Sequence, residues 1–173
     1  MKLAGLTHGG FYNHFDSRAT LVGEAIGFAM DQMTERWQKL ANEKKGEARF
    51  EALIADYVST RHRDNSKQGC ALPALAADIA RLSQSERRAF AEKFEKMLQV
   101  FAELCPGEGT LQARQIATGA VATMVGAILL SRAVGTGKLS DDILEAGRLT
   151  AGAGMRKHRR KLSKAARSDA SSR

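Results

Sequence analysis

Apolar residues recur at intervals of three and four positions through most of this 173-residue chain. The clearest example runs from Leu21 to Leu40, where large apolar residues repeat at that spacing among polar ones. This interval matches the 3.6 residues of an α-helical turn and places the apolar side chains on one helix face. The chain has only two prolines and few β-branched runs, so the sequence predicts an all-α fold.

The expected helices share this period and are separated by polar or glycine-containing segments. They cover about 17–42, 50–58, 70–82, 83–104, 111–134 and 140–162. Ser83 or Ser85 is expected to cap the fourth helix, because a serine hydroxyl accepts from the free N–H groups of a first turn. The sixth helix is expected to start at Ser140, with acidic residues in its first turns. Small residues in 111–134 would let a neighbouring helix approach closely.

The longest apolar run, Ile116–Leu130, is too short to span a membrane and contains Thr118 and Thr123. We interpret it as part of a buried helix. The N-terminus lacks the charged and apolar regions of a signal peptide. We expect a cytoplasmic protein with no membrane partner.

Positive charge is concentrated at the C-terminal end of the chain. The net charge is +8, but residues 156–173 hold eight Lys or Arg and one acid, so the other 155 residues are nearly neutral. A terminus rich in Lys, Arg, Ser and Ala is typical of a disordered extension, which is how we interpret 156–173. The alternatives are a tail that attracts DNA without sequence preference and one that meets a membrane surface.

The N-terminal segment Leu6–Phe15 combines helix-capping, glycine and polar residues in an unusual order. Thr7 is a good N-cap, whereas the two glycines at 9 and 10 disfavour a helix and suit a close approach to another backbone. Phe11 and Phe15 share one face, and the residues between them can bond phosphates or base edges. The alternative is a short amphipathic helix with a solvated polar face.

This segment resembles the DNA-reading helix of TetR-type (tetracycline-repressor-type) regulators. The matching positions are Thr7, Gly9, Phe11, Tyr12, His14, Phe15, Asp16 and Ser17. The resemblance implies a recognition helix at 7–15 within an incomplete helix-turn-helix head at 1–16, since only five residues precede the motif. The residues that it assigns to DNA contact are Thr7, His8, Gly9, Gly10, Tyr12, Asn13, His14 and Arg18.

The resemblance also implies an antiparallel helical body over 17–155 that binds a ligand and dimerises. In TetR-type proteins the last two long helices, here about 111–134 and 140–162, pair with their copies. The large side chains that could line a pocket for a small apolar ligand are Met33, Trp37, Phe50, Tyr57, Phe90, Phe94, Met97 and Phe101. A stripe of this kind at helical spacing is also typical of plain core.

The two cysteines show no metal-binding spacing, and a disulfide framework is not expected. Cys70, after Gly69 at an expected helix start, is a possible redox site, because a helix N-terminus favours the thiolate. The alternative is a small buried apolar residue. The sequence contains no catalytic or metal-binding constellation, so we expect neither an enzyme nor a cofactor.

The resemblance therefore implies a ligand-responsive transcriptional regulator that represses by binding a palindromic operator as a homodimer. The alternative is a ligand-binding and dimerisation module without specific DNA binding. The two predictions differ in whether residues 1–16 still read DNA.

Overall fold

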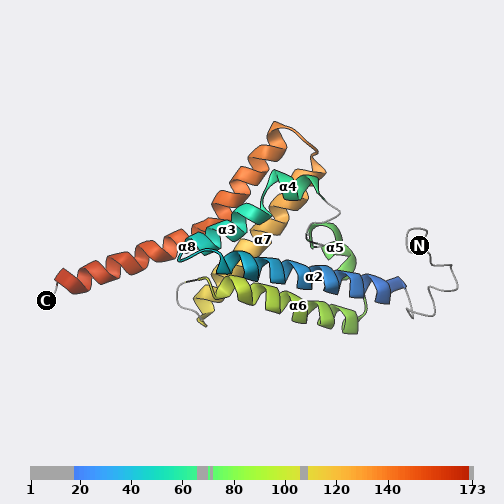
Figure 1. Cartoon of the computed structure of the whole chain (residues 1–173), viewed down its shortest axis with the longest axis horizontal. Helices are drawn as coiled ribbons and strands as arrows, with labels where there is room; N and C mark the ends of the chain where they lie inside the picture. Colours follow the sequence, from blue (N-terminus) through green and yellow to red (C-terminus); the bar gives the residue numbers. More distant parts are fainter. Residues whose placement is uncertain (1–17, 66–69, 71, 106–108, 172–173) are drawn as a thin grey trace.

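The computed structural model describes residues 18–65, 70, 72–105 and 109–171. These residues form helices and contain no strand, which confirms the all-α prediction. The helices are α2 (Arg18–Asn42), α3 (Ala48–Tyr57), α4 (Thr60–Asp64), α5 (Leu72–Ile79), α6 (Gln84–Ala102), α7 (Leu111–Ala133) and α8 (Lys138–Ser171) (Figure 1).

Two pairs of long helices organise the molecule (Figure 1). α7 and α8 are antiparallel, as expected for the body. α2 and α6 run in the same direction, because α3, α4 and α5 return the chain to the end where α2 begins. The side chains show this direction: Asp31 pairs with Lys93, and further along both helices the Trp37 ring lies 4.7 Å from that of Phe101.

Small residues bring α7 and α8 close together. A Cβ atom at Gly147 would lie 2.4 Å from the Cβ of Ala127, and one at Gly154 would lie 3.4 Å from Ile116. Real Cβ atoms do not approach as closely as 2.4 Å, so α8 can reach α7 at this point only because position 147 is glycine. The Ala- and Gly-rich composition of this region therefore serves close helix packing.

An aromatic cluster fills the core between α2, α3 and α6. The Trp37 ring meets those of Tyr57 and Phe101 edge to face, and Phe50 meets Phe101 in the same way, with centroids 5.4 Å apart. All four side chains are almost completely buried. Burial of each ring contributes roughly 1.5–3 kcal/mol, so this cluster is a main source of stability.

Ser83 and Ser140 lie near the first turns of α6 and α8 and have different roles there. Ser83 forms a capping box at α6: its hydroxyl accepts from the Glu86 N–H, and the Glu86 carboxylate accepts from the Ser83 N–H. This confirms a serine cap at this helix. Ser140 does not cap α8, which begins two residues earlier at Lys138. The Ser140 hydroxyl instead donates to the Ser131 carbonyl 2.9 Å away and joins α8 to α7.

α8 continues through the basic end of the chain. Residues 156–171 are helical, which corrects the prediction of a disordered tail. We call this segment the C-terminal arm; Figure 1 shows it extending away from the body. Its residues explain the correction, because Ala, Lys, Arg and Leu are all strong helix formers and can continue a helix that packing has already started.

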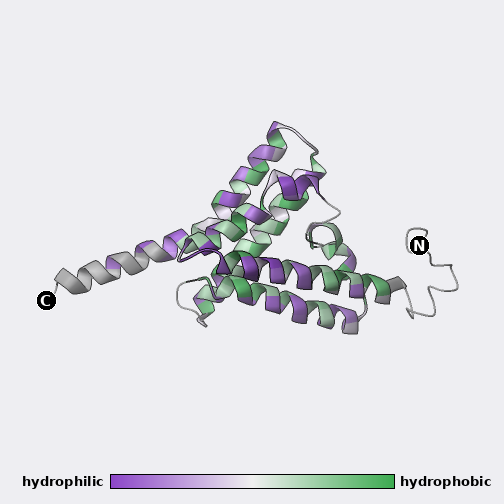
Figure 2. Cartoon of the chain, in the orientation of Figure 1, coloured by the Kyte–Doolittle hydropathy of each residue, from purple (hydrophilic) through white to green (hydrophobic). Residues whose placement is uncertain are grey.

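α7 is the described helix that is long and apolar enough to cross a membrane by length and composition alone. It is hydrophobic along most of its length (Figure 2). One of its faces, which includes Val121, Met124 and Ile128, is buried inside the body. A helix that packs inside the body of a domain passes the same test of length and composition.

Candidate functional site

The residues expected to read DNA precede the described part of the chain, with one exception. Thr7, His8, Gly9, Gly10, Tyr12, Asn13 and His14 lie outside the described residues. Arg18 is the first residue of α2, and the structure describes its backbone. α2 thus begins directly after the segment to which the sequence assigns DNA reading.

Most of the side chains expected to line a ligand pocket pack against one another in the core. At most 1% of the surface of each of Trp37, Phe50, Tyr57, Met97 and Phe101 is exposed. For these five the structure favours the alternative interpretation, plain core. Met33 is also buried, beside a small cavity of about 110 Å³ that Tyr57 shares. Phe94 is half-buried and stacks on Phe90.

Phe90 lines a much larger groove between the first half of α2, the end of α5 and the first half of α6. Its volume is about 1010 Å³, which is comparable with the roughly 300–1,000 Å³ of small-molecule sites. The lining residues come from all three helices and the turn before α6. They are Thr20, Gly23, Glu24, Ile26, Gly27, Phe28, Asp31, Ile79, Arg81, Leu82, Ser83, Ser85, Glu86, Ala89, Phe90 and Lys93.

The groove has an apolar floor and a charged rim. Ile26 and Ile79 are buried in the floor, and Phe90 is half-buried there. At the rim the Lys93 ammonium pairs with Asp31 of α2. The stem of Lys93 lies across Gly27, where a Cβ atom would come within 2.9 Å of it. This arrangement suits an apolar molecule with polar groups at its edge.

The sequence pattern could not locate this groove, because periodicity shows which faces are apolar but not which of them stays uncovered. The available signal was the pair Gly23 and Gly27, one turn apart on α2. Glycine is disfavoured inside a helix, so two at this spacing indicate a need for space beside it. Among the pocket residues predicted from sequence, Phe90 is the one that lines the groove.

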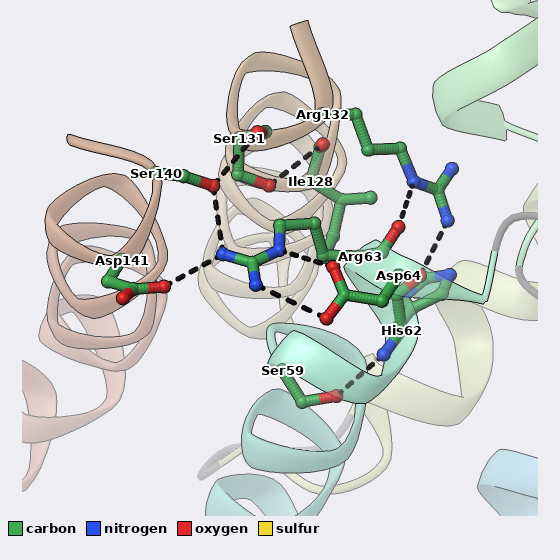
Figure 3. A network of polar contacts seen from close by, with 9 residues as sticks. All are labelled: Ser59, His62, Arg63, Asp64, Ile128, Ser131, Arg132, Ser140 and Asp141. Atoms are coloured by element: carbon green, nitrogen blue, oxygen red, sulfur yellow. Dashed lines mark hydrogen bonds and ion pairs between the residues drawn. The ribbon is translucent and has the colours of Figure 1, made fainter. Parts of the chain in front are cut away.

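A network of polar contacts fastens α4 to α7 and α8 (Figure 3). Arg132 of α7 donates to the carbonyls of His62 and Arg63, at 2.6 and 3.0 Å. The Arg63 guanidinium donates to the Ser140 hydroxyl at 2.9 Å and to the Asp141 carboxylate at 2.7 Å. The last carbonyl groups of a helix have no N–H partner within that helix, and here the Arg132 guanidinium provides the missing donors. The periodic pattern did not predict α4, because five residues are too few to show a period.

His62 lies at the centre of this connection with both ring nitrogens engaged. Nδ1 is 2.7 Å from the Tyr57 carbonyl, and Nε2 is 3.0 Å from the Cys70 backbone nitrogen. A carbonyl only accepts and an amide N–H only donates, so the ring must be neutral with its proton on Nδ1. Burial lowers the pKa of His62 below its ordinary value, and the positive charge of Arg132 acts in the same direction.

Cys70 does not have the environment of a reactive thiol. Its side chain is buried, and burial raises the pKa of the thiol above its usual value. This is opposite to the shift expected at a helix N-terminus, because the lost hydration of the thiolate outweighs the hydrogen bonds from the Tyr57 side chain and the Leu72 backbone, which both lower the pKa. The structure therefore favours the alternative for Cys70, a small buried residue. Burial also raises the pKa of Cys105, to about 11.

The fold and the groove define a helical regulatory domain: a long helix leads from the N-terminal segment, a ligand-sized groove borders it, and two long helices complete the body. Residues 46–143 match the C-terminal domain of LmrA/YxaF-like transcriptional regulators. This match runs from the turn before α3 to the first turns of α8 and covers more than half of the chain. The chain therefore belongs to the TetR family of transcriptional regulators. A search of curated proteins found no match.

Proposed function

We propose that this transcriptional regulator is a ligand-responsive, cytoplasmic repressor that binds a palindromic operator as a homodimer. The observation that carries this proposal is the groove of about 1010 Å³ along the first half of α2. α2 directly follows the residues expected to read DNA. A small apolar ligand in the groove would therefore act on the helix that carries the DNA-reading segment.

The ligand would work by separating α2 from α6. In the groove region the two helices are joined by the Asp31–Lys93 ion pair, in which both side chains are partly exposed. Such a pair contributes at most about 1 kcal/mol, so a ligand that fills the groove can displace it. The new position of α2 would move the recognition segments of the dimer away from the separation of one DNA turn, about 34–36 Å.

Exposed apolar side chains support a dimer through α7 and α8. Among the described residues the large hydrophobic side chains with substantial exposure are Phe28, Leu111, Leu129, Leu130, Val134, Leu139 and Leu149. All but Phe28 lie on α7, on α8 or at the end of α7. On α8, Leu139 and Leu149 share one face with Ala146 and Ala153, which are also exposed. An apolar face of this size marks an interaction site.

A furrow between the same two helices completes this surface. It has a volume of about 380 Å³ and is lined by small residues of both helices, among them Gly119, Thr123, Thr150 and Gly154, together with the larger Gln112, Gln115, Ile116, Lys157 and His158. Exposed apolar side chains therefore lie beside a furrow on the same two helices. A second copy related by a two-fold axis presents the same side chains and the same furrow, so the two surfaces can match each other. We propose this α7–α8 surface as the dimer interface.

The experiment that tests the function selects duplexes from a randomised DNA pool with the full chain. We expect enrichment of a palindrome with half-sites one DNA turn apart. His8→Ala and Asn13→Ala should abolish its specific binding, measured by fluorescence anisotropy, while sedimentation still shows a dimer. Enrichment of no sequence by a chain that dimerises would support the alternative, a ligand-binding and dimerisation module. Unchanged specificity in both variants would exclude the assigned reading residues.

A further inference from the structure

The C-terminal arm is a structural element that the proposed function does not use. α8 has 34 residues and is about 51 Å long. Among the side chains of α8 that the structure describes, Met155 is the last buried one; His158 is half-buried, and Arg156, Lys157, Arg160 and Lys164 are exposed. Figure 1 shows the arm extending from the body at the end opposite the first turn of α2. These four basic side chains therefore lie outside the core and face solvent.

The direction of the arm is set where α8 leaves the body. Figure 1 shows α8 changing direction between the part that packs on α7 and the arm. Close to this boundary, the Arg156 guanidinium donates to the carbonyl of Leu149. It lies where a side chain at position 152 would be, since a Cβ atom on Gly152 would fall 2.3 Å from it. Gly152 thus leaves room for the Arg156 side chain beside the helix backbone.

The arm carries a strong excess of positive charge. Residues 156–171 include seven Lys or Arg and a single acid, Asp169. Arg156, Arg160, Lys164 and Arg167 follow one another at four, four and three residues, which places them in a row along one side of the helix. Figure 2 shows hydrophilic residues on the described turns of the arm. The helix thus carries one cation on each successive turn of this side.

We propose that the arm binds the phosphate backbone of double-stranded DNA without sequence preference. A row of cations on a helix complements a regular polyanion and gains affinity by releasing its counterions. An amphipathic membrane helix needs a broad apolar face, whereas Leu162 is the one large apolar residue of the arm. Because the arm and the start of α2 lie at opposite ends of the molecule, the arm contacts a stretch of DNA other than the operator.

The test measures binding of the full chain to an unrelated fluorescent duplex by anisotropy between 50 and about 200 mM KCl. The arm variant is Arg160→Gln/Lys164→Gln/Arg167→Gln, in which glutamine preserves helix propensity. The control variant, Lys39→Gln/Lys44→Gln/Lys45→Gln, loses the same charge from exposed positions at the end of α2. Circular dichroism of each variant establishes that the helical content is retained.

The arm variant should bind the duplex more weakly, and the slope of log affinity against log salt should fall by about 2.7, or 0.9 for each lost phosphate contact. The control variant should keep the slope of the unmodified chain. An equal loss in both variants, or no loss in the arm variant, would overturn the proposal. So would arm-dependent binding to phosphatidylserine vesicles or duplex RNA in place of DNA. The arm variant is also tested in the selection from the randomised DNA pool. If it still enriches a palindromic operator, the repressor function is intact and the weaker binding to the unrelated duplex is due to the arm alone.

Discussion

At the scale of single residues, His62 shows how one side chain joins separate parts of the fold. It accepts from the Cys70 N–H on one side of its ring and donates to the Tyr57 carbonyl on the other, and its own carbonyl accepts from Arg132. The charged groups that influence it from neighbouring helices are Arg36 and Arg132, which disfavour its protonation, and Asp56, which favours it. A second ring proton would point at the Cys70 N–H and break that contact.

Stability should therefore fall at acid pH through His62. Its pKa in the folded protein is lowered by burial, so protonation favours the unfolded chain, in which a histidine has a pKa of about 6.5. The contribution of His62 is complete above about pH 6.5 and is lost as the pH falls from there toward the lower folded pKa. Urea unfolding at neutral pH and in mild acid measures the free energy of unfolding under both conditions.

His62→Gln provides the control for this prediction. Glutamine offers one donor and one acceptor at similar reach, and neither titrates. The variant should lose less free energy of unfolding than the unmodified chain between the two pH values. If both proteins lose the same amount, other groups cause the acid sensitivity and His62 has only a structural role.

The sequence could not reveal this role of His62. It lies in a polar stretch, where a histidine is usually solvated. Its partners Tyr57 and Cys70 are five and eight residues away but outside its own helix, and Arg132 is 70 residues away, so only the tertiary fold brings them together. Cys70 illustrates the same limit. Its position near an expected helix start indicated a favoured thiolate, but burial, which depends on the tertiary fold, reverses the shift of the pKa.

At the scale of elements, periodicity located the long helices well. The expected ranges 17–42 and 111–134 differ from α2 and α7 by one residue at an end. A pattern of fifteen or more residues leaves little doubt about a helix, whereas α4 has five residues and depends on the Ser59 cap and on Arg132. The helical state of the arm was missed, because its charge resembles that of disordered tails.

The groove between α2 and α6 should admit a bulky apolar molecule. Nile red, whose fluorescence rises in apolar surroundings, should bind to the full chain. Ala89→Trp places an indole in the groove from α6 and should remove most of the fluorescence enhancement. Ala55→Trp, at an exposed position on α3, is the matched control and should bind the dye as the unmodified chain does. Equal enhancement in all three proteins would place the dye elsewhere.

At the scale of the whole molecule, the sequence predicted the all-helical body and its two long C-terminal helices. It could not predict which helix face remains open, because that depends on how seven helices of the described chain pack together. The eight pocket candidates show the consequence. Trp37 and Phe101 were as plausible as Phe90 from their spacing, yet they lie in the core and Phe90 lines the groove.

Dimerisation should depend on the exposed face of α7 and α8. Leu149→Glu puts a charge on this face and should shift the chain from a dimer to a monomer of 18.8 kDa in sedimentation velocity. Phe28→Glu is the matched control: the two side chains are 60% and 65% exposed, but Phe28 lies on α2. It should leave the dimer intact. A dimer that survives Leu149→Glu and dissociates with Phe28→Glu would place the interface on α2.

Because α2 and α6 run in the same direction, the aromatic cluster joins them near one end and the groove separates them near the other, so α2 could rotate about the cluster. One end is fixed where Trp37 is buried against Phe101, and the groove opens along the other. Arg18 lies nineteen residues from Trp37, or roughly 28 Å along the helix axis. With the fulcrum at the aromatic cluster, a rotation of α2 by about 5° would displace its first turn by about 2.5 Å. Under the proposed mechanism, a ligand that gains only a little room between the helices would produce its largest movement at the end of α2 that leads to the expected DNA-reading segment.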